Sequence, residues 1–248
     1  MQEVEISSVG DYLKFRSNED WDARKPAWFR GHASASWNLI PGYYRAERTI
    51  SETSLLARFK QSAAMLAELQ PKDAYDWLFL MQHYGVLTRL LDWSESPLVA
   101  LYFAVAENRE DHPEGAALWR LDPTELNKHA SIVNQDEEYY IPSFEDEELK
   151  GYTPESVTVG RKMELYPVAT LATRNNARIQ AQMGTFTIHH NKQISLEDVG
   201  NGSHVTKFLI SSDACQNVLR ELRDLGINRF SMFPELSSVG LIIKDSMA

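Results

Sequence analysis

The chain has 248 residues, of which 43% are hydrophobic and 24% are charged, and its formal net charge is −10. This composition is typical of a globular protein with a sizeable core and excludes a disordered chain. So acidic a chain is poorly suited to nonspecific binding of duplex nucleic acid, which needs many Lys and Arg contacts to phosphates. A local basic cleft, or an RNA held at one or two positions, remains compatible with it.

Targeting signals and covalent cross-links are also constrained. No stretch approaches the roughly 18 to 20 apolar residues that a membrane span requires, and residues 1–5 lack the basic and apolar regions of a signal peptide. The single cysteine, Cys215, excludes an intrachain disulfide and a zinc site built from several cysteines. These features predict a cytoplasmic protein that does not contact a membrane.

The first predicted elements are a strand and two helices. An apolar strand is expected over residues 27–30, closed by Gly31. Helical periodicity covers residues 51–70. A second helix is expected to begin at the capping residue Asp73 and to end at Gly85, a residue that favours the left-handed conformation of a C-terminal cap.

The middle of the chain is predicted to form the core. An extended piece at 88–92 leads to Ser96 and Pro97, and Ser before Pro is a strong helix start. The helix that follows is apolar on every side, so it should be buried on most faces, beneath a sheet. A strand is expected at 116–121.

The region 122–163 is acidic and lacks clear periodicity, so it is predicted to be an insertion or a mobile lid with a short helix. Its acidic runs, 136–138 and 145–148, are typical of a solvated loop, and the alternative is a surface that imitates nucleic acid or docks a basic partner.

The C-terminal part is predicted to contain strands at 179–189 and 205–210 and a helix from Ser212 or Asp213 to Gly226. Strands and helices are interspersed without regular βαβ alternation. The predicted fold class is therefore α+β, with a mixed, mostly antiparallel, split β-sheet core and flanking helices.

Arg30 is the first candidate for chemistry, because its guanidinium stands at the end of an apolar strand. The planar fork of arginine suits a phosphate or a carboxylate, and Gly31 allows the backbone to turn sharply or to approach a ligand closely. The alternative is a buried structural salt bridge.

The second candidate is a dense polar cluster between residues 82 and 92. Its hydrogen-bonding side chains are those of Gln82, His83, Tyr84, Thr88, Arg89 and Asp92. An unpaired polar group drawn into a core costs about 1–3 kcal/mol, so the cluster forms either a tight internal network or the lining of a pocket. Two structural roles are alternatives to a functional one. Arg89 and Asp92 would form a local ion pair, and His83 would be a core histidine with its hydrogen bonds satisfied.

Two later segments are weaker candidates. A strand is expected at 179–189, and Arg178 directly precedes it. Side chains alternate along a strand, so Arg178, Gln180 and Gln182 would share one face and could line a site. The alternative is that this face of the sheet is simply exposed to solvent. Glu235 is the carboxylate of an aromatic turn at 230–236, where helix capping or a salt bridge would also explain it.

Several familiar mechanisms are excluded by missing motifs. The chain has no G-x-x-x-x-G-K loop, no G-x-G-x-x-G, no H-E-x-x-H and no G-x-S-x-G. The adjacent His189 and His190 would point to opposite faces of a strand, which disfavours a shared metal site. No metal is expected.

Taken in order, the segments resemble the FRG-domain family. The matching motifs are Phe-Arg-Gly at 29–31, Gln-His-Tyr-Gly…Thr-Arg-Leu-Leu-Asp-Trp at 82–93, Pro-Leu-x-Ala-Leu-Tyr-Phe-Ala at 97–104, Arg-Ile-x-x-Gln-x-Gly-x-Phe at 178–186, and Phe-Pro-Glu-Leu at 233–236. The resemblance spans about residues 25–240, and it implies a single FRG-type domain over residues 1–248.

The layout also resembles that of ADP-ribosyltransferases. By that resemblance, Arg30 and Gly31 would hold the phosphates of NAD, Thr88 would support the nicotinamide pocket, and Gln180 and Gln182 would take the place of a carboxylate-bearing motif. Glutamine cannot supply the negative charge that stabilises an oxocarbenium-like ribose. Asp92 or Glu235 would have to supply that charge, or His83 would act as the base.

This resemblance implies an NAD-consuming ADP-ribosyltransferase that acts on a protein or nucleic-acid (RNA or DNA) acceptor, as a toxin or anti-phage defence effector with an antitoxin or other regulatory partner. NAD is its expected substrate. The residues assigned to catalysis are Arg30, His83, Asp92, Gln182 and Glu235. Those assigned to binding of NAD are Phe29, Gly31, Gln82, Tyr84, Thr88, Arg89 and Gln180. The alternatives are a noncatalytic module that binds a nucleotide or a partner, and a hydrolase of NAD or of a phosphodiester.

Overall fold

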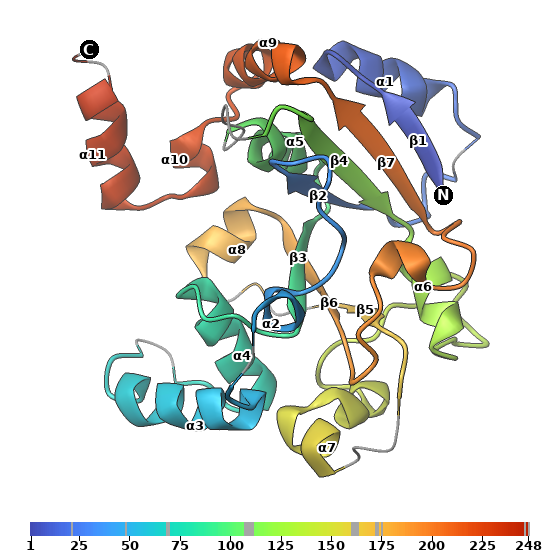
Figure 1. The fold of residues 1–248 in the computed structure, drawn as a ribbon, viewed down its shortest axis with the longest axis vertical. Coiled ribbons are helices and arrows are strands. Elements are labelled where there is room, and N and C mark those ends of the chain that lie inside the picture. Colours follow the sequence, from blue (N-terminus) through green and yellow to red (C-terminus); the bar gives the residue numbers. More distant parts are fainter. Residues whose placement is uncertain are drawn as a thin grey trace.

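A computed structural model describes residues 1–20, 22–47, 49–67, 70–106, 112–159, 164–171, 174, 176–245 and 247. Within these residues one sheet runs through the molecule in the order β1-β7-β4-β2-β3-β6-β5 (Figure 1). Its strands are β1 (Gln2–Glu5), β2 (Trp28–His32), β3 (Leu90–Ser94), β4 (Ala116–Leu121), β5 (Val168–Thr170), β6 (Gly184–Ile188) and β7 (Val205–Ile210). Strand β1 is parallel to β7, and the other neighbours are antiparallel. The predicted α+β class with a mixed, mostly antiparallel sheet is confirmed.

The sheet opens between β2 and β3. Strand β2 pairs with β4 along its whole length, from Trp28 opposite Leu121 to His32 opposite Ala117. Against β3 it has a single pair, Phe29 opposite Ser94. Beyond Phe29 the two strands therefore diverge, and their facing edges leave room for side chains.

One face of the half-sheet β1-β7-β4-β2 is covered by α1 (Val9–Ser17), α5 (Pro97–Ala106) and α9 (Ser212–Asp224) (Figure 1). The apolar helix α5 is buried as predicted, with Leu101 and Ala104 fully inaccessible. It crosses β2 at Gly31, where a Cβ atom would lie 2.0 Å from Ala100 O and 2.4 Å from Ala104 N. Gly31 was predicted to end the strand but lies inside it. Because glycine has no Cβ atom, its backbone allows α5 to pack directly against β2.

The other half-sheet, β3-β6-β5, packs with α3 (Glu52–Ala63), α4 (Ala74–His83) and the 3-10 helix η1 (Glu147–Tyr152), and α7 (Pro154–Val159) packs on α3 and η1. The predicted ends of α4 are confirmed. Asp73 Oδ1 accepts hydrogen bonds from Tyr75 N at 2.8 Å and Asp76 N at 2.9 Å, and Gly85 has a φ of +79°. Helix α3 is shorter than predicted, and residues 68 and 69 of that prediction lie outside the described residues.

Residues 122–159, predicted as an insertion or lid, contribute to the core. Helix α6 (Pro123–His129) is fastened to β5 through Asn127, which donates to Ala169 O at 3.0 Å and accepts from Ala169 N at 2.7 Å. Leu149 and Tyr152 of η1 are buried. Residues 160–163 of the predicted segment lie outside the described residues.

The strand predicted at 179–189 is wrong in its first half. A short helix, α8 (Ala177–Ala181), precedes β6, and the side chain of Asn176 caps it by accepting from Ile179 N at 2.8 Å. Strands at 116–121 and 205–210 are confirmed as β4 and β7.

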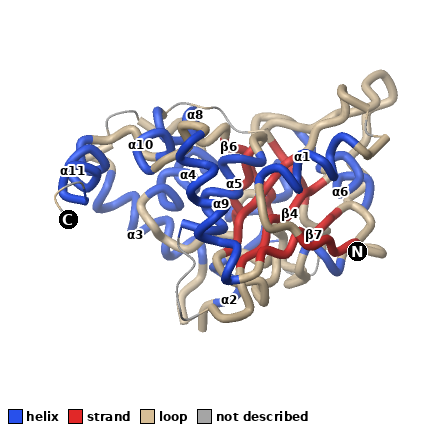
Figure 2. Tube along the Cα trace, turned by 90° about the horizontal axis from the view of Figure 1, so that it is seen from above, coloured by secondary structure: helices blue, strands red, loops and turns tan. Residues whose placement is uncertain are grey.

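The remaining elements lie between β2 and α3, between β6 and β7, and after α9. They are α2 (Gly42–Arg45), the 3-10 helix η2 (Leu196–Asp198), α10 (Arg229–Met232) and α11 (Leu236–Asp245). Figure 2 shows α10 and α11 at the end of the molecule away from the N-terminus. Among the described helices, none has the length and hydropathy needed to cross a membrane.

Candidate functional site

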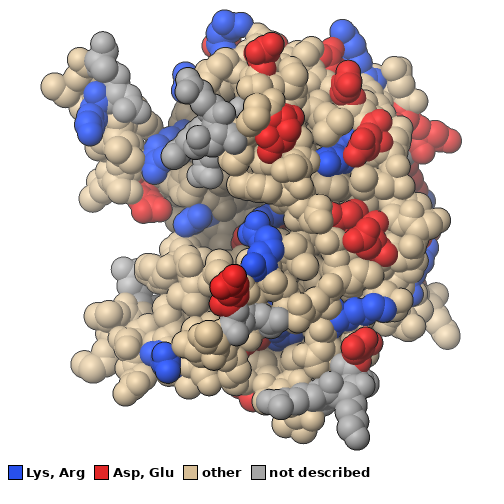
Figure 3. Space-filling model, viewed as in Figure 1, with Lys and Arg blue, Asp and Glu red and all other residues tan. Residues whose placement is uncertain are grey.

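The opening between β2 and β3 forms a pocket with a volume of about 380 Å³. Residues of β2, α2, α4, β3, α5 and α8 line it, and Figure 3 shows the surface hollowed beside α8, with basic side chains at the edge of the hollow. The predicted site residues that line it are Phe29, Arg30, Gly31, Gln82, His83, Thr88, Asp92 and Gln182. The sheet topology thus brings two segments, separated by about fifty residues in the sequence, into one cavity.

Four of these residues form a continuous hydrogen-bonded network. Thr88 Oγ1 donates to Gln82 Oε1, and Gln82 Nε2 donates to Asp92 Oδ2 at 2.8 Å. Arg30 Nη1 donates to the carbonyl oxygen of Asp92 at 2.7 Å and lies 3.8 Å from its Oδ2. The network fixes the orientation of the Gln82 amide and holds the Asp92 carboxylate between two donors.

Asp92 is the residue of β3 that faces solvent. Its side chain is 57% exposed, whereas the other four residues of the strand are buried. Within the described residues, the hydrogen bonds to its carboxylate involve Oδ2, so Oδ1 is available to a ligand.

Arg30 is oriented by His32, which lies two residues further along β2 and so on the same face. Arg30 Nε donates to His32 Nε2 at 3.0 Å. Because an arginine nitrogen always donates, Nε2 of His32 accepts this hydrogen bond. Its other ring nitrogen, Nδ1, lies 3.2 Å from Trp37 O. The indole nitrogen of Trp119 also lies 3.2 Å from Nδ1. Burial, followed by the charge of Arg30, lowers the pKa of His32 well below its usual range, so this side chain is neutral at pH 7.

The free edge of Arg30 faces the pocket. Of its five N–H donors, those on Nε and Nη1 supply the bonds to His32 and Asp92, and Nη2 donates to no residue in the described part of the chain. Burial lowers the pKa of Arg30, Asp92 opposes that shift, and Arg45 adds to it. An arginine pKa starts so high that the group stays charged at neutral pH.

Three basic groups and one acid set the electrostatics of the pocket. Arg45 and Arg178 join Arg30 in the lining, and Asp92 is the one carboxylate among the described residues that line it. The Arg178 guanidinium stacks on Phe233, 4.8 Å from the ring centroid. The site is locally basic although the chain carries a net charge of −10. Sequence reasoning missed His32 and Arg45, and the signal for His32 was its i+2 position from Arg30.

His83 lines the pocket at the C-terminal end of α4. Its pKa is lowered by burial and by Arg178, while Glu235 opposes the shift. A neutral imidazole here can accept a proton. Glu235 itself is exposed, does not line the pocket, and accepts a hydrogen bond from Ser237 Oγ at 3.2 Å.

Arg89 does not line the pocket. It is buried in the protein and bonded to three other segments of the chain. Its side chain is 1% exposed, and its Nε lies 2.6 Å from Glu52 Oε2. Its Nη1 donates to His189 O at 2.5 Å and its Nη2 to Tyr152 O at 2.7 Å. Arg89, which was predicted to bind NAD, is enclosed by protein and lies away from the pocket. The alternative ion pair with Asp92 does not form, since Arg89 pairs with Glu52.

The predicted row of Arg178, Gln180 and Gln182 on one strand face does not form. Arg178 and Gln180 lie on α8 and Gln182 caps its end, so the comparison with a carboxylate-bearing strand motif fails at this point. Gln180 is exposed outside the pocket, and Gln182 reaches across to α10, where its Nε2 donates to Met232 O at 3.1 Å. Tyr84 is 69% exposed and also lies outside the lining.

The family model of the FRG domain matches residues 25–113. The chain carries an FRG domain. This FRG domain spans β2, α2, α3, α4, β3 and α5, and it contributes Arg30, His32, Arg45, Gln82 and Asp92 to the pocket. Arg178 and Gln182 come from the chain that follows it. No curated protein and no solved structure matches the chain.

Proposed function

We propose that the pocket binds NAD and transfers its ADP-ribose to a protein or nucleic-acid acceptor. The observation that supports this most is the network of Thr88, Gln82, Asp92 and Arg30, which places a carboxylate beside an arginine with spare donors at one pocket. A cavity of about 380 Å³ lies within the range of small-molecule sites.

The proposed reaction breaks the bond between C1′ of the ribose and the ring nitrogen of nicotinamide, which leaves with the bonding electrons. An oxygen or nitrogen of the acceptor then bonds to C1′ and loses its proton. Arg30 would bind a phosphate through its free edge. The Asp92 carboxylate would stabilise the positive charge that develops on the ribose.

Two groups could take the acceptor proton. Asp92 Oδ1 carries no hydrogen bond within the described residues, and His83 has a lowered pKa and an unprotonated nitrogen at neutral pH. Gln182 would serve a positioning role at most, because an amide carries no charge and its Nε2 already donates to Met232 O.

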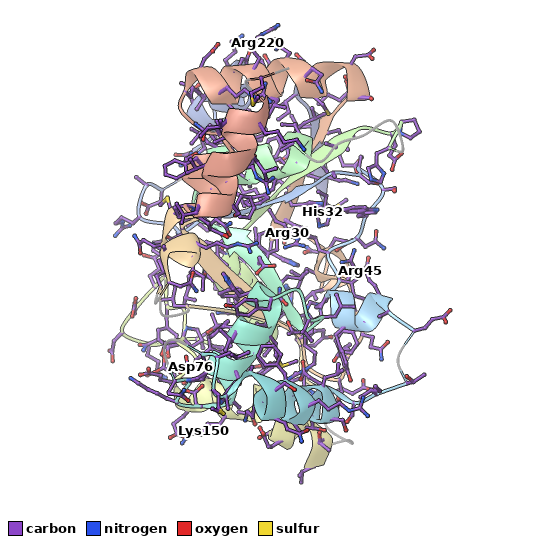
Figure 4. The ribbon with its side chains drawn as sticks, turned by 90° about the vertical axis from the view of Figure 1, so that its left-hand side faces the viewer. Arg30, His32, Arg45, Asp76, Lys150 and Arg220 are labelled. Atoms are coloured by element: carbon purple, nitrogen blue, oxygen red, sulfur yellow. The ribbon has the colours of Figure 1, made fainter. Side chains whose placement is uncertain are left out.

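The direct test is incubation of the protein with NAD labelled in its adenosine moiety, together with cell extract or RNA. The wild type should label an acceptor and release nicotinamide, and Asp92→Asn should lower both rates by about a hundredfold or more. The matched control is Asp76→Asn, which alters an acid on α4 outside this pocket (Figure 4). Absence of both label transfer and nicotinamide release in the wild type would refute the proposal.

A noncatalytic nucleotide-binding module is the second candidate. Two observations favour it. The Asp92 carboxylate already has Gln82 and Arg30 as neighbouring donors, which leaves it less able to act on a ligand. The described lining residues also include no second acid that could act in its place. This candidate predicts thermal stabilisation by nucleotide without turnover. Release of free ADP-ribose without a labelled acceptor would instead indicate a hydrolase.

A further inference from the structure

Two arginines from different elements line the same pocket. Arg30 lies on β2 and Arg45 is the last residue of α2, and both line the cavity. Figure 4 shows both in the middle of the molecule, near His32 and far from Arg220 on α9. They are close enough for the charge of Arg45 to lower the pKa of both Arg30 and His32.

This pair of positive charges is poorly compensated by the protein. Asp92 is the nearby acid, and it lies 3.8 Å from Arg30 Nη1. Within the described residues, Arg45 forms no ion pair with a carboxylate. Like charges held together in a partly desolvated site raise its free energy, and a bound anion lowers it.

Local packing keeps Arg45 beside the cavity. A Cβ atom on Gly42 would lie 2.8 Å from Leu87 Cδ2 and 3.8 Å from Arg45 Nη2. The guanidinium of Arg45 therefore folds back along its own helix to lie beside Gly42, which also lines the pocket.

We propose that Arg30 and Arg45 form a subsite for a diphosphate, so that the pocket selects ligands with two linked phosphoryl groups over monophosphates. The Nη2 edge of Arg30 and the fork of Arg45 provide two separate sets of donors, and each set matches one phosphoryl group. That this diphosphate belongs to NAD rests on the proposed function. The subsite would recognise the two phosphoryl groups that link the halves of NAD.

The test uses inorganic pyrophosphate and inorganic phosphate as probes, with the whole protein at constant ionic strength. Isothermal titration should show pyrophosphate binding at least about tenfold more tightly than phosphate, the size of effect expected from one additional charged hydrogen-bonded contact. Arg45→Gln should remove this preference. Arg45→Lys, which keeps the charge but loses the fork, should retain part of it.

The matched control is Arg220→Gln on α9, whose guanidinium hydrogen-bonds Asn217 Oδ1 at the surface. Its pyrophosphate preference should equal that of the wild type. Arg45 is exposed and its removal relieves repulsion with Arg30, so the melting temperature of Arg45→Gln without ligand should be no lower than that of the wild type. Equal affinities of the wild type for the two probes, or a preference that survives Arg45→Gln, would overturn the subsite.

The outcomes separate this inference from the proposed function. If the wild type releases nicotinamide from NAD but shows no Arg45-dependent preference for pyrophosphate, the function stands and the subsite is wrong. If pyrophosphate binds through Arg45 and NAD neither binds nor reacts, the subsite stands and the proposed function is wrong.

Discussion

Two arginine–carboxylate pairs involve residues of β3 or next to it, and their surroundings differ sharply. Arg89 and Glu52 are 1% and 6% exposed in their side chains, and three separate groups accept from the guanidinium. Arg30 and Asp92 are 20% and 57% exposed, and the guanidinium keeps one edge free.

Side-chain exposure and the number of donors satisfied by the protein distinguish the structural arginine, Arg89, from Arg30, which is open to the pocket. A fully enclosed guanidinium must have its donors satisfied by the protein, because an unpaired buried charge is very costly. At the opening between β2 and β3, solvent can satisfy the remaining donors, so Arg30 can exchange water for a ligand. We expect the two arginines to give opposite results when mutated.

The largest expected effect is that of Arg89→Ala, which leaves Glu52 charged and buried without its partner. The free energy of unfolding should fall by about 3–5 kcal/mol, measured by urea denaturation. The exposed control Arg220→Ala should change it by less than about 0.5 kcal/mol. The double variant Arg89→Met with Glu52→Leu should recover much of the loss, and a loss below about 1 kcal/mol for Arg89→Ala alone would remove the contrast between the two pairs.

Next in size is Gly31→Ala, beside Arg30. The added Cβ would meet backbone atoms of α5 at 2.0 and 2.4 Å, so the free energy of unfolding should fall by about 2–3 kcal/mol through overpacking. Gly10→Ala is the matched control, since its nearest contact would be Ser8 Oγ at 3.5 Å. Helix propensity predicts that this control stabilises α1 by about 0.5–1 kcal/mol, and similar behaviour of the two variants would contradict the close approach of α5.

A pH effect of intermediate size should arise beside Arg89. Burial lowers the pKa of His189 to about 3, so below pH 6.5 the unfolded chain binds a proton that the folded protein does not. The contribution of His189 to stability is therefore complete above about pH 6.5 and declines as the pH falls, by about 2 kcal/mol at pH 5. Denaturation curves at pH 7.5 and 5 would measure it, and His189→Asn should show a correspondingly smaller decline. An equal decline in that variant would rule out His189 as the source.

The smallest expected change in stability is that of Arg30→Ala. Loss of its hydrogen bonds to His32 and Asp92 should cost about 1 kcal/mol, because solvent reaches the site. Binding of pyrophosphate should nevertheless weaken by at least about tenfold, as measured by titration. Two outcomes would show that the two pairs do not differ as described. One is that Arg30→Ala binds pyrophosphate as tightly as the wild type. The other is that its free energy of unfolding falls by as much as that of Arg89→Ala.

Local sequence signals determined much of the secondary structure and fold class. Asp73 and Gly85 set the ends of α4, and Ser96 with Pro97 set the start of α5, because caps depend on residues within a few positions of each other. The strand predicted through Gln180 does not form because the side chain of Asn176 caps a helix, α8, at this point. That capping signal was present in the sequence.

The candidate site was predictable only in part, since eight of the twelve predicted site residues line the pocket and Tyr84, Arg89, Gln180 and Glu235 do not. Arg30 is predicted from its place at the end of an apolar strand, and Gln82, Thr88 and Asp92 are predicted from local polar clustering. The tertiary structure joins the four residues. Arg89 looked equivalent to them in the sequence, since its partner Glu52 lies 37 positions away. Burial and pairing across such distances depend on how helices and strands pack, and only the tertiary structure decides them. The sequence by itself determined which side chains are polar and where many of the elements begin, and the opening between β2 and β3 determined which of these side chains line the pocket.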